Sequence, residues 1–141
     1  MTDMNHPVVP PRIFCVGLNY KAHTKEMGSG LPAEPVIFMK PATSLVVIGE
    51  PLKLPKGQGS VHHEMELVVA IGKQGADIPV EAAQGYVAGV TLGIDLTLRD
   101  LQSKLKQVGA PWELSKSFDG SAAIGKIKAW PMQSDIQNID M

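Results

Sequence analysis

The chain has 141 residues, which is enough for one domain with a single hydrophobic core. Its formal net charge of -1 gives no electrostatic basis for binding nucleic acid or an anionic membrane. A single cysteine, Cys15, excludes an internal disulfide framework, and the sequence shows neither a secretory signal nor a membrane-spanning apolar run, so we expect a soluble, cytoplasmic protein.

The first half of the chain consists of short apolar runs separated by prolines and glycines. Residues 1–11 are predicted to form a flexible, polar arm, and the domain itself is expected over residues 12–141. Asn19 is predicted to cap a short helix over residues 20–27, which ends at Gly28. The strands predicted in this half, in chain order, cover residues 13–17, 36–39, 44–48 and, as an edge strand flanked by prolines, 51–55.

The second half contains the two longest predicted strands, at residues 62–71 and 87–96. Glycines at positions 89 and 93 indicate places where another part of the chain approaches the backbone closely. The helices predicted in this half cover residues 80–86 and 97–108. Many short strands with few, short helices predict a mainly β domain with mixed strand pairing, not a doubly wound parallel sheet.

Two acidic residues on the 62–71 strand carry the main functional inference. Glu64 and Glu66 are two positions apart, so both side chains point to the same face of a strand that continues into an apolar run. Placing two carboxylates side by side in such a setting is costly, and a divalent cation between them removes the repulsion. Asp95, a lone acid after an apolar stretch, is the third candidate ligand. All-carboxylate sites favour hard cations, Mg²⁺ first and then Mn²⁺ or Ca²⁺.

Two other interpretations of these acids stay open at this point. The glutamates could form an ordinary solvated strand face. Alternatively, His62, on the same face two residues earlier, could join them in a zinc site. The zinc interpretation leaves Asp95 unexplained, and neither His62 nor His63 has the helical spacing of a zinc-enzyme motif.

A histidine and a carboxylate form the candidate catalytic base. His23 and Glu26 are three positions apart on the predicted 20–27 helix and therefore share a face. A carboxylate beside an imidazole orients it and makes it more basic, which suits the activation of a water molecule. The glycines after this helix would allow it to move as a lid. On pattern alone, the flanking Lys21 and Lys25 favour an exposed helix of alternating charge over this catalytic pair.

Three cations are candidates for anion binding. Lys116 lies between apolar residues, where it could bind a substrate carboxylate or stabilise an enolate, or instead extend to solvent. Arg99 is four positions after Asp95, near enough to reach the same pocket, and Gln102 follows in the same predicted helix. Spacing alone does not decide whether Lys40 reaches this pocket.

Five motifs occur together and in order, and they carry a resemblance to a known family. They are Val-Gly-Leu-Asn-Tyr-Lys-Ala-His at 16–23, Pro-Val-Ile-Phe-Met-Lys-Pro at 35–41, Val-His-His-Glu-Met-Glu-Leu at 61–67, Asp-Leu-Thr-Leu-Arg-Asp-Leu-Gln at 95–102 and Pro-Trp-Glu-Leu-Ser-Lys-Ser-Phe-Asp at 111–119. With them the chain resembles the fumarylacetoacetate hydrolase family, and is most similar to its small acylpyruvase and oxaloacetate decarboxylase members.

The resemblance implies a mixed β-sandwich roll, usually a homodimer, with Mg²⁺ or Mn²⁺ in its active site. Carried over by position, it implies that the metal ligands are Glu64, Glu66 and Asp95. It also implies that His23 with Glu26 activates water on a mobile lid, and that Lys116 stabilises the enolate or the carboxylate of the substrate. Arg99, Gln102 and Lys40 would be neighbouring substrate-binding residues.

The chain departs from this family in two places. Asp-Gly-Ser-Ala-Ala at 119–123 replaces the turn that follows Phe118 in the relatives. The further strands and the Gly-Thr-Pro loop that complete the family domain have no counterpart, so we expect a domain that is incomplete at its C-terminus and exposes apolar sheet edges.

The resemblance implies a metal-dependent hydrolase that cleaves a carbon–carbon bond in acylpyruvate-type 2,4-diketo acids. Decarboxylation of oxaloacetate would pass through the same pyruvate enolate. One alternative is an isomerase or hydratase of aromatic-acid catabolism, acting on 2-hydroxymuconate-type substrates. The other is a non-catalytic, truncated metal-binding fragment that acts only with a complementing chain.

Overall fold

The computed structural model describes residues 10–20, 32–47 and 49–129, which form two sheets. β1 (Arg12–Gly17) and β2 (Val36–Pro41) pair antiparallel in a two-stranded sheet. The second sheet has five strands in the order β3-β6-β5-β4, with β7 also paired to β5. These strands are β3 (Leu45–Val47), β4 (Val61–Ile71), β5 (Val87–Leu98), β6 (Ala122–Ile124) and β7 (Lys128–Ala129).

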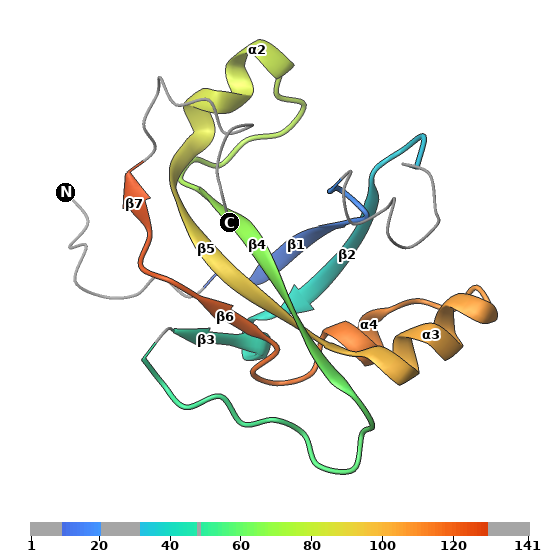
Figure 1. The fold of residues 1–141 in the computed structure, drawn as a ribbon. Helices are drawn as coiled ribbons and strands as arrows, with labels where there is room; N and C mark the ends of the chain where they lie inside the picture. The colour runs from blue at the N-terminus through green and yellow to red at the C-terminus, as the bar shows by residue number, and fades with distance from the viewer. Residues whose placement is uncertain (1–9, 21–31, 48, 130–141) are drawn as a thin grey trace.

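Strand pairing is mixed, as the sequence predicts. β3 and β6 are parallel, whereas β5 is antiparallel to β4, β6 and β7. The β4–β5 ladder is the longest, and its register places Glu64 opposite Asp95 and Glu66 opposite Gly93. Figure 1 shows this long, twisted pair crossing the β1–β2 sheet. Directly opposed residues of an antiparallel pair share a face, so the ladder brings Glu64 and Asp95 together.

The helices are short and lie near the two ends of the β4–β5 pair (Figure 1). α2 (Val80–Ala83) continues into the 3₁₀ turn η2 (Gln84–Tyr86) at one end, while α3 (Arg99–Gln107) and α4 (Glu113–Lys116) lie at the other. A further 3₁₀ turn, η1 (Ala42–Ser44), joins β2 to β3. None of the helices in the described ranges is long and apolar enough to cross a membrane.

Several boundaries differ from the sequence-based expectations. Residues 51–55 are not a strand, because the prolines at both ends have no N–H group for a ladder. α3 begins two residues later than predicted, since β5 keeps pairing with β4 as far as Leu98. β6 and β7 were not predicted and are too short to show a pattern of their own. Most of the predicted arm and of the predicted 20–27 helix lies outside the described residues.

The most deeply buried part of the described structure is largely polar. Only five apolar side chains are buried there, namely Phe38, Leu96, Leu98, Ala122 and Ala123. The buried polar side chains are Lys40, Ser44, Asp95, Thr97, Gln102, Ser115, Lys116 and Ser121. Charged groups are rarely buried unless they are paired, so this cluster is the place to look for function.

Candidate active site

Lys116, the last residue of α4, forms the centre of the buried cluster. Its side chain is only 2% exposed. The Lys116 ammonium donates to Glu64 Oε2 and to Asp95 Oδ2, at 2.6 Å in both cases. Its position between two carboxylates excludes the solvent-exposed alternative that its local sequence allowed.

Lys40 reaches the same cluster from β2, in the other sheet. Its side chain is 1% exposed, and its Nζ lies 2.9 Å from Asp95 Oδ1. The Lys40 ammonium also donates to Ser121 Oγ at 3.0 Å and to the main-chain carbonyl of Lys116. Burial lowers the pKa of Lys40, and the charge of Asp95 partly offsets this effect. Ser121, which the sequence did not single out, therefore helps to hold the cluster.

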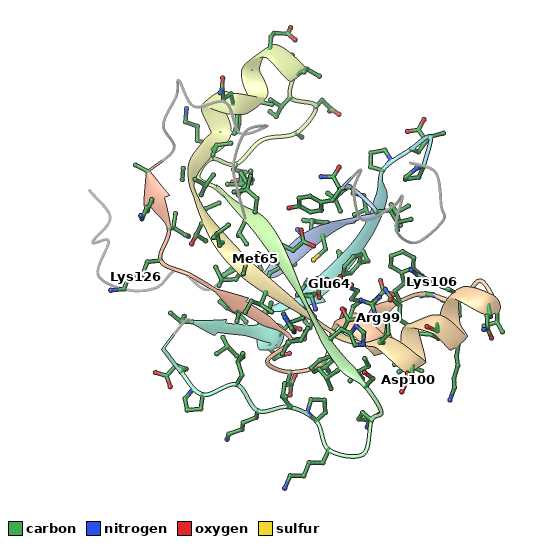
Figure 2. All side chains as sticks on the ribbon, viewed as in Figure 1. Glu64, Met65, Arg99, Asp100, Lys106 and Lys126 are labelled. Carbon is green, nitrogen blue, oxygen red and sulfur yellow. The ribbon has the colours of Figure 1, made fainter. Side chains whose placement is uncertain are left out.

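The first turn of α3 holds the other side of Glu64. The Arg99 guanidinium donates to Glu64 Oε1 and, at 2.6 Å, to Gln102 Oε1. Burial alone would raise the pKa of Glu64, but hydrogen bonds and charges from Lys116 and Arg99 outweigh it and lower that pKa. Figure 2 shows Glu64 and Arg99 close together where α3 meets the β4–β5 pair. Glu64 is thus a firmly ionised carboxylate.

Glu66 has a different environment, although it shares the face of Glu64. Burial raises the pKa of Glu66 to about 7; a hydrogen bond with the Tyr20 hydroxyl opposes the rise, and the negative charges of Asp95 and Glu64 add to it. The Tyr20 hydroxyl also accepts a hydrogen bond from the Leu67 N–H at 3.3 Å. The sequence did not identify Tyr20, because nothing local relates it to β4.

The three predicted metal ligands share a face of the β4–β5 pair, but they do not form a ready coordination sphere. Among the residues that the structure describes, no three acidic, histidine or cysteine side chains are arranged to hold one ion. One observation nevertheless fits a cation here. Burial raises the pKa of Glu66, the negative charges of Asp95 and Glu64 add to the rise, and a positive charge beside Glu66 would stabilise its ionised form. An all-carboxylate donor set suits Mg²⁺ or Mn²⁺.

The remaining candidates lie elsewhere. His23 and Glu26 fall outside the described residues, so their roles stay predictions. His62 and His63 are exposed and line a shallow hollow with Ser60 and Val61. His62 is exposed, and among the described residues it belongs to no group of three side chains that could hold an ion, so the structure does not support the zinc alternative.

Known proteins share both the sequence and the fold of this chain. The profile of the family described as Fumarylacetoacetate (FAA) hydrolase C-terminal matches residues 12–141. An oxaloacetate tautomerase of Escherichia coli (strain K12) is 46% identical over 136 residues, which are 96% of this chain and 61% of that protein. A mitochondrial oxaloacetate decarboxylase of Dictyostelium discoideum is 39% identical over 131 residues, 92% of this chain and 60% of that protein.

A solved structure gives the same result. The fumarylpyruvate hydrolase from Pseudomonas aeruginosa, crystallised with Mn²⁺ and pyruvate, superposes with a TM-score of 0.77 at 47% identity. The match covers 84% of this chain and 53% of that one, so this chain spans between about half and three fifths of the length of these relatives. The mixed β fold and the matched sequence agree, and the chain belongs to the fumarylacetoacetate hydrolase family.

Proposed function

We propose that the chain carries the metal-binding and enolate-stabilising residues of an enzyme that cleaves the carbon–carbon bond of acylpyruvate-type 2,4-diketo acids, and that it also decarboxylates oxaloacetate. The observation that carries the proposal is the Lys116 ammonium, buried between Glu64 and Asp95 at 2.6 Å from each. Both reactions generate a pyruvate enolate, and a buried ammonium is a strong stabiliser of such a developing negative charge.

In this proposal the three acidic side chains bind the metal, and the neighbouring cationic side chains hold two of these acids in position. Glu64, Glu66 and Asp95 would bind Mg²⁺ or Mn²⁺, which supplies a Lewis acid for the keto oxygen and carboxylate of a 2-oxo acid. Manganese and pyruvate in the Pseudomonas aeruginosa relative support this choice. Arg99 fixes one oxygen of Glu64, and Lys40 fixes the position of Asp95.

The chain's own residues would then act on the substrate in a simple order. His23, oriented by Glu26, would take a proton from water as the water attacks the distal carbonyl of an acylpyruvate. As the carbon–carbon bond breaks, Lys116 would stabilise the negative charge on the departing enolate oxygen. Oxaloacetate needs no water, because loss of carbon dioxide leaves the same enolate.

Keto–enol isomerisation is the second candidate function. The Escherichia coli relative is named an oxaloacetate tautomerase, and a tautomerase must stabilise the same type of enolate without breaking a carbon–carbon bond. Release of pyruvate from acetylpyruvate or oxaloacetate supports the first function, whereas interconversion of the keto and enol forms without pyruvate supports the second.

The proposal also covers the oligomeric state of the protein and its place in the cell. We expect a homodimer that binds a small 2-oxo acid and acts in the cytoplasm. The Dictyostelium discoideum relative is named as mitochondrial, which supports a different compartment for that protein.

The test compares Glu64→Gln with Lys116→Met. We expect Glu64→Gln to lose Mg²⁺ or Mn²⁺ binding in calorimetry and, with it, pyruvate release from acetylpyruvate. Lys116→Met keeps all three proposed ligands and should still bind the metal. It should lose about 100-fold or more in kcat, because the enolate loses its ammonium partner and Glu64 and Asp95 each lose one of theirs. Metal-dependent turnover that survives Glu64→Gln would refute the ligand assignment. A wild-type chain that binds metal without any turnover would instead support the non-catalytic fragment.

A further inference from the structure

Lys106 is a cation of the site that the proposed chemistry does not use. Arg99, Gln102 and Lys106 occupy positions i, i+3 and i+7 of α3 and therefore share one face of the helix. Figure 2 shows Lys106 on the same part of the molecule as Arg99 and Glu64. The Lys106 side chain is half-buried, and its Nζ lies 4.8 Å from the centre of the Trp112 ring.

Two aromatic rings connect Lys106 to the centre of the site. The Trp112 ring packs against Phe38 at 5.9 Å between centroids and 52° between planes. The Phe38 ring in turn contacts Lys116, whose Nζ lies 5.3 Å from the Phe38 centroid. Trp112 also lies close to β1, since a Cβ on Gly17 would be 3.0 Å from its ring. The rings thus form a packed aromatic wall with an ammonium group at each end.

The charges around Lys106 leave positive charge uncompensated. Burial lowers the pKa of Lys106, the charges of Arg99 and Lys116 lower it further, and Glu64 opposes them. Lys106 is therefore close enough to Arg99, Lys116 and Glu64 to interact with their charges. Within the described ranges of the chain it forms no ion pair with a carboxylate. A bound anion would complete this arrangement.

We propose that Lys106 binds the remote carboxylate of a dicarboxylic 2-oxo acid, whose carbon chain lies along the partly exposed Trp112 ring. This inference rests on the proposed function, because the 2-oxo acid end of the substrate is assigned to the acids and Lys116. It narrows the substrate class to 2,4-diketo acids with a second carboxylate, in preference to acylpyruvates that end in an uncharged alkyl group.

The test compares a dianionic with a monoanionic substrate. Lys106→Met should lower kcat/KM for fumarylpyruvate by about 10- to 100-fold, mainly through KM, because a charge-assisted contact to bound substrate is lost. Activity on acetylpyruvate should stay within about twofold. Lys106→Arg keeps the charge and the stacking on Trp112, so it should restore most of the activity on the dianion.

Lys104→Met is the matched control, because Lys104 is exposed on the same helix and should leave both substrates unaffected. An equal loss on both substrates after Lys106→Met, or no loss on either, overturns the subsite. If the wild type turns over no keto acid, the proposed function fails separately. Calorimetric binding of fumarylpyruvate and acetylpyruvate to the wild type and Lys106→Met then decides: selective weakening for fumarylpyruvate supports the subsite, and equal affinities refute it.

Discussion

Glu64 and Glu66 face the same side of β4, but neighbouring residues give them different charge states. Lys116 and Arg99 overcome the effect of burial and lower the pKa of Glu64, whereas burial raises that of Glu66 to about 7. A two-residue step along a strand thus separates a carboxylate whose pKa is lowered from one whose pKa is raised to about 7.

The raised pKa of Glu66 predicts a pH-dependent stability of the metal-free protein. The value is about 7 when folded, against 4.5 for an unperturbed glutamate, so the folded state binds the proton more tightly. This contribution to stability is complete below about pH 4.5 and is lost as the pH rises through about 7. Between these limits, wild type should lose up to about 3 kcal/mol of unfolding free energy relative to Glu66→Gln, which has no carboxylate to ionise.

Urea unfolding across this pH range, with a chelator present, measures the effect. Excess Mg²⁺ should reduce the loss if Glu66 is a metal ligand, because the cation stabilises the ionised form. Parallel stability curves for wild type and Glu66→Gln in chelator would show that Glu66 titrates normally.

At the scale of the elements, two glycines let β5 pair on both sides. A Cβ on Gly89 would lie 2.2 Å from the Lys128 carbonyl oxygen of β7, and one on Gly93 would lie 2.7 Å from Val68 Cγ2 of β4. The sequence-based prediction of close approach at these glycines is therefore confirmed. The neighbour at Gly89 is backbone, which cannot move aside as a flexible side chain can.

Gly89→Ala should consequently destabilise the protein, by about 1–3 kcal/mol, because the added methyl group forces β7 away from β5. Gly85→Ala is the matched control, since a Cβ at Gly85 meets nothing within 4 Å. Chemical unfolding of the two variants measures the difference. Equal stability of Gly89→Ala and wild type would mean that the β5–β7 pairing contributes nothing to the fold.

At the scale of the whole molecule, the outer face of the β1–β2 sheet is apolar and exposed. The cross-strand pairs Phe14–Met39 and Val16–Ile37 cover it, with exposures of 61%, 44%, 45% and 53% in that order. Contiguous exposed apolar patches of this kind mark interaction surfaces. The predicted homodimer is one way to cover this face.

We therefore expect the wild-type chain to self-associate in a concentration-dependent way, as measured by size-exclusion chromatography with light scattering. Replacing Phe14 by Ser together with Met39 by Lys should shift the population toward monomer. Val80→Ser changes an apolar side chain that is 89% exposed on α2, away from this face, and should have no such effect. A wild type that remains monomeric at every concentration would refute the association.

Local sequence was sufficient to predict the strands that carry the acids and the helix that follows them. Alternation along β4 places Glu64 and Glu66 on one face because side chains of a strand alternate by geometry. The apolar run before Asp95 likewise identified β5. Such patterns depend only on neighbours along the chain, so they can be recognised without knowing the rest of the fold.

Only the tertiary structure showed which cations and hydroxyl groups surround those acids. The local pattern of Lys116 allowed exposure and that of Lys40 allowed either position, yet both are buried on Asp95. Tyr20, Ser121 and Lys106 were not singled out, because their roles depend on contacts made in the folded chain. Tyr20 contacts Leu67, Ser121 contacts Lys40, and Lys106 lies over Trp112. β6 and β7 exist through their pairing with β5. A sequence pattern shows which face a residue occupies, whereas only the packing of sheets and helices shows what that face meets.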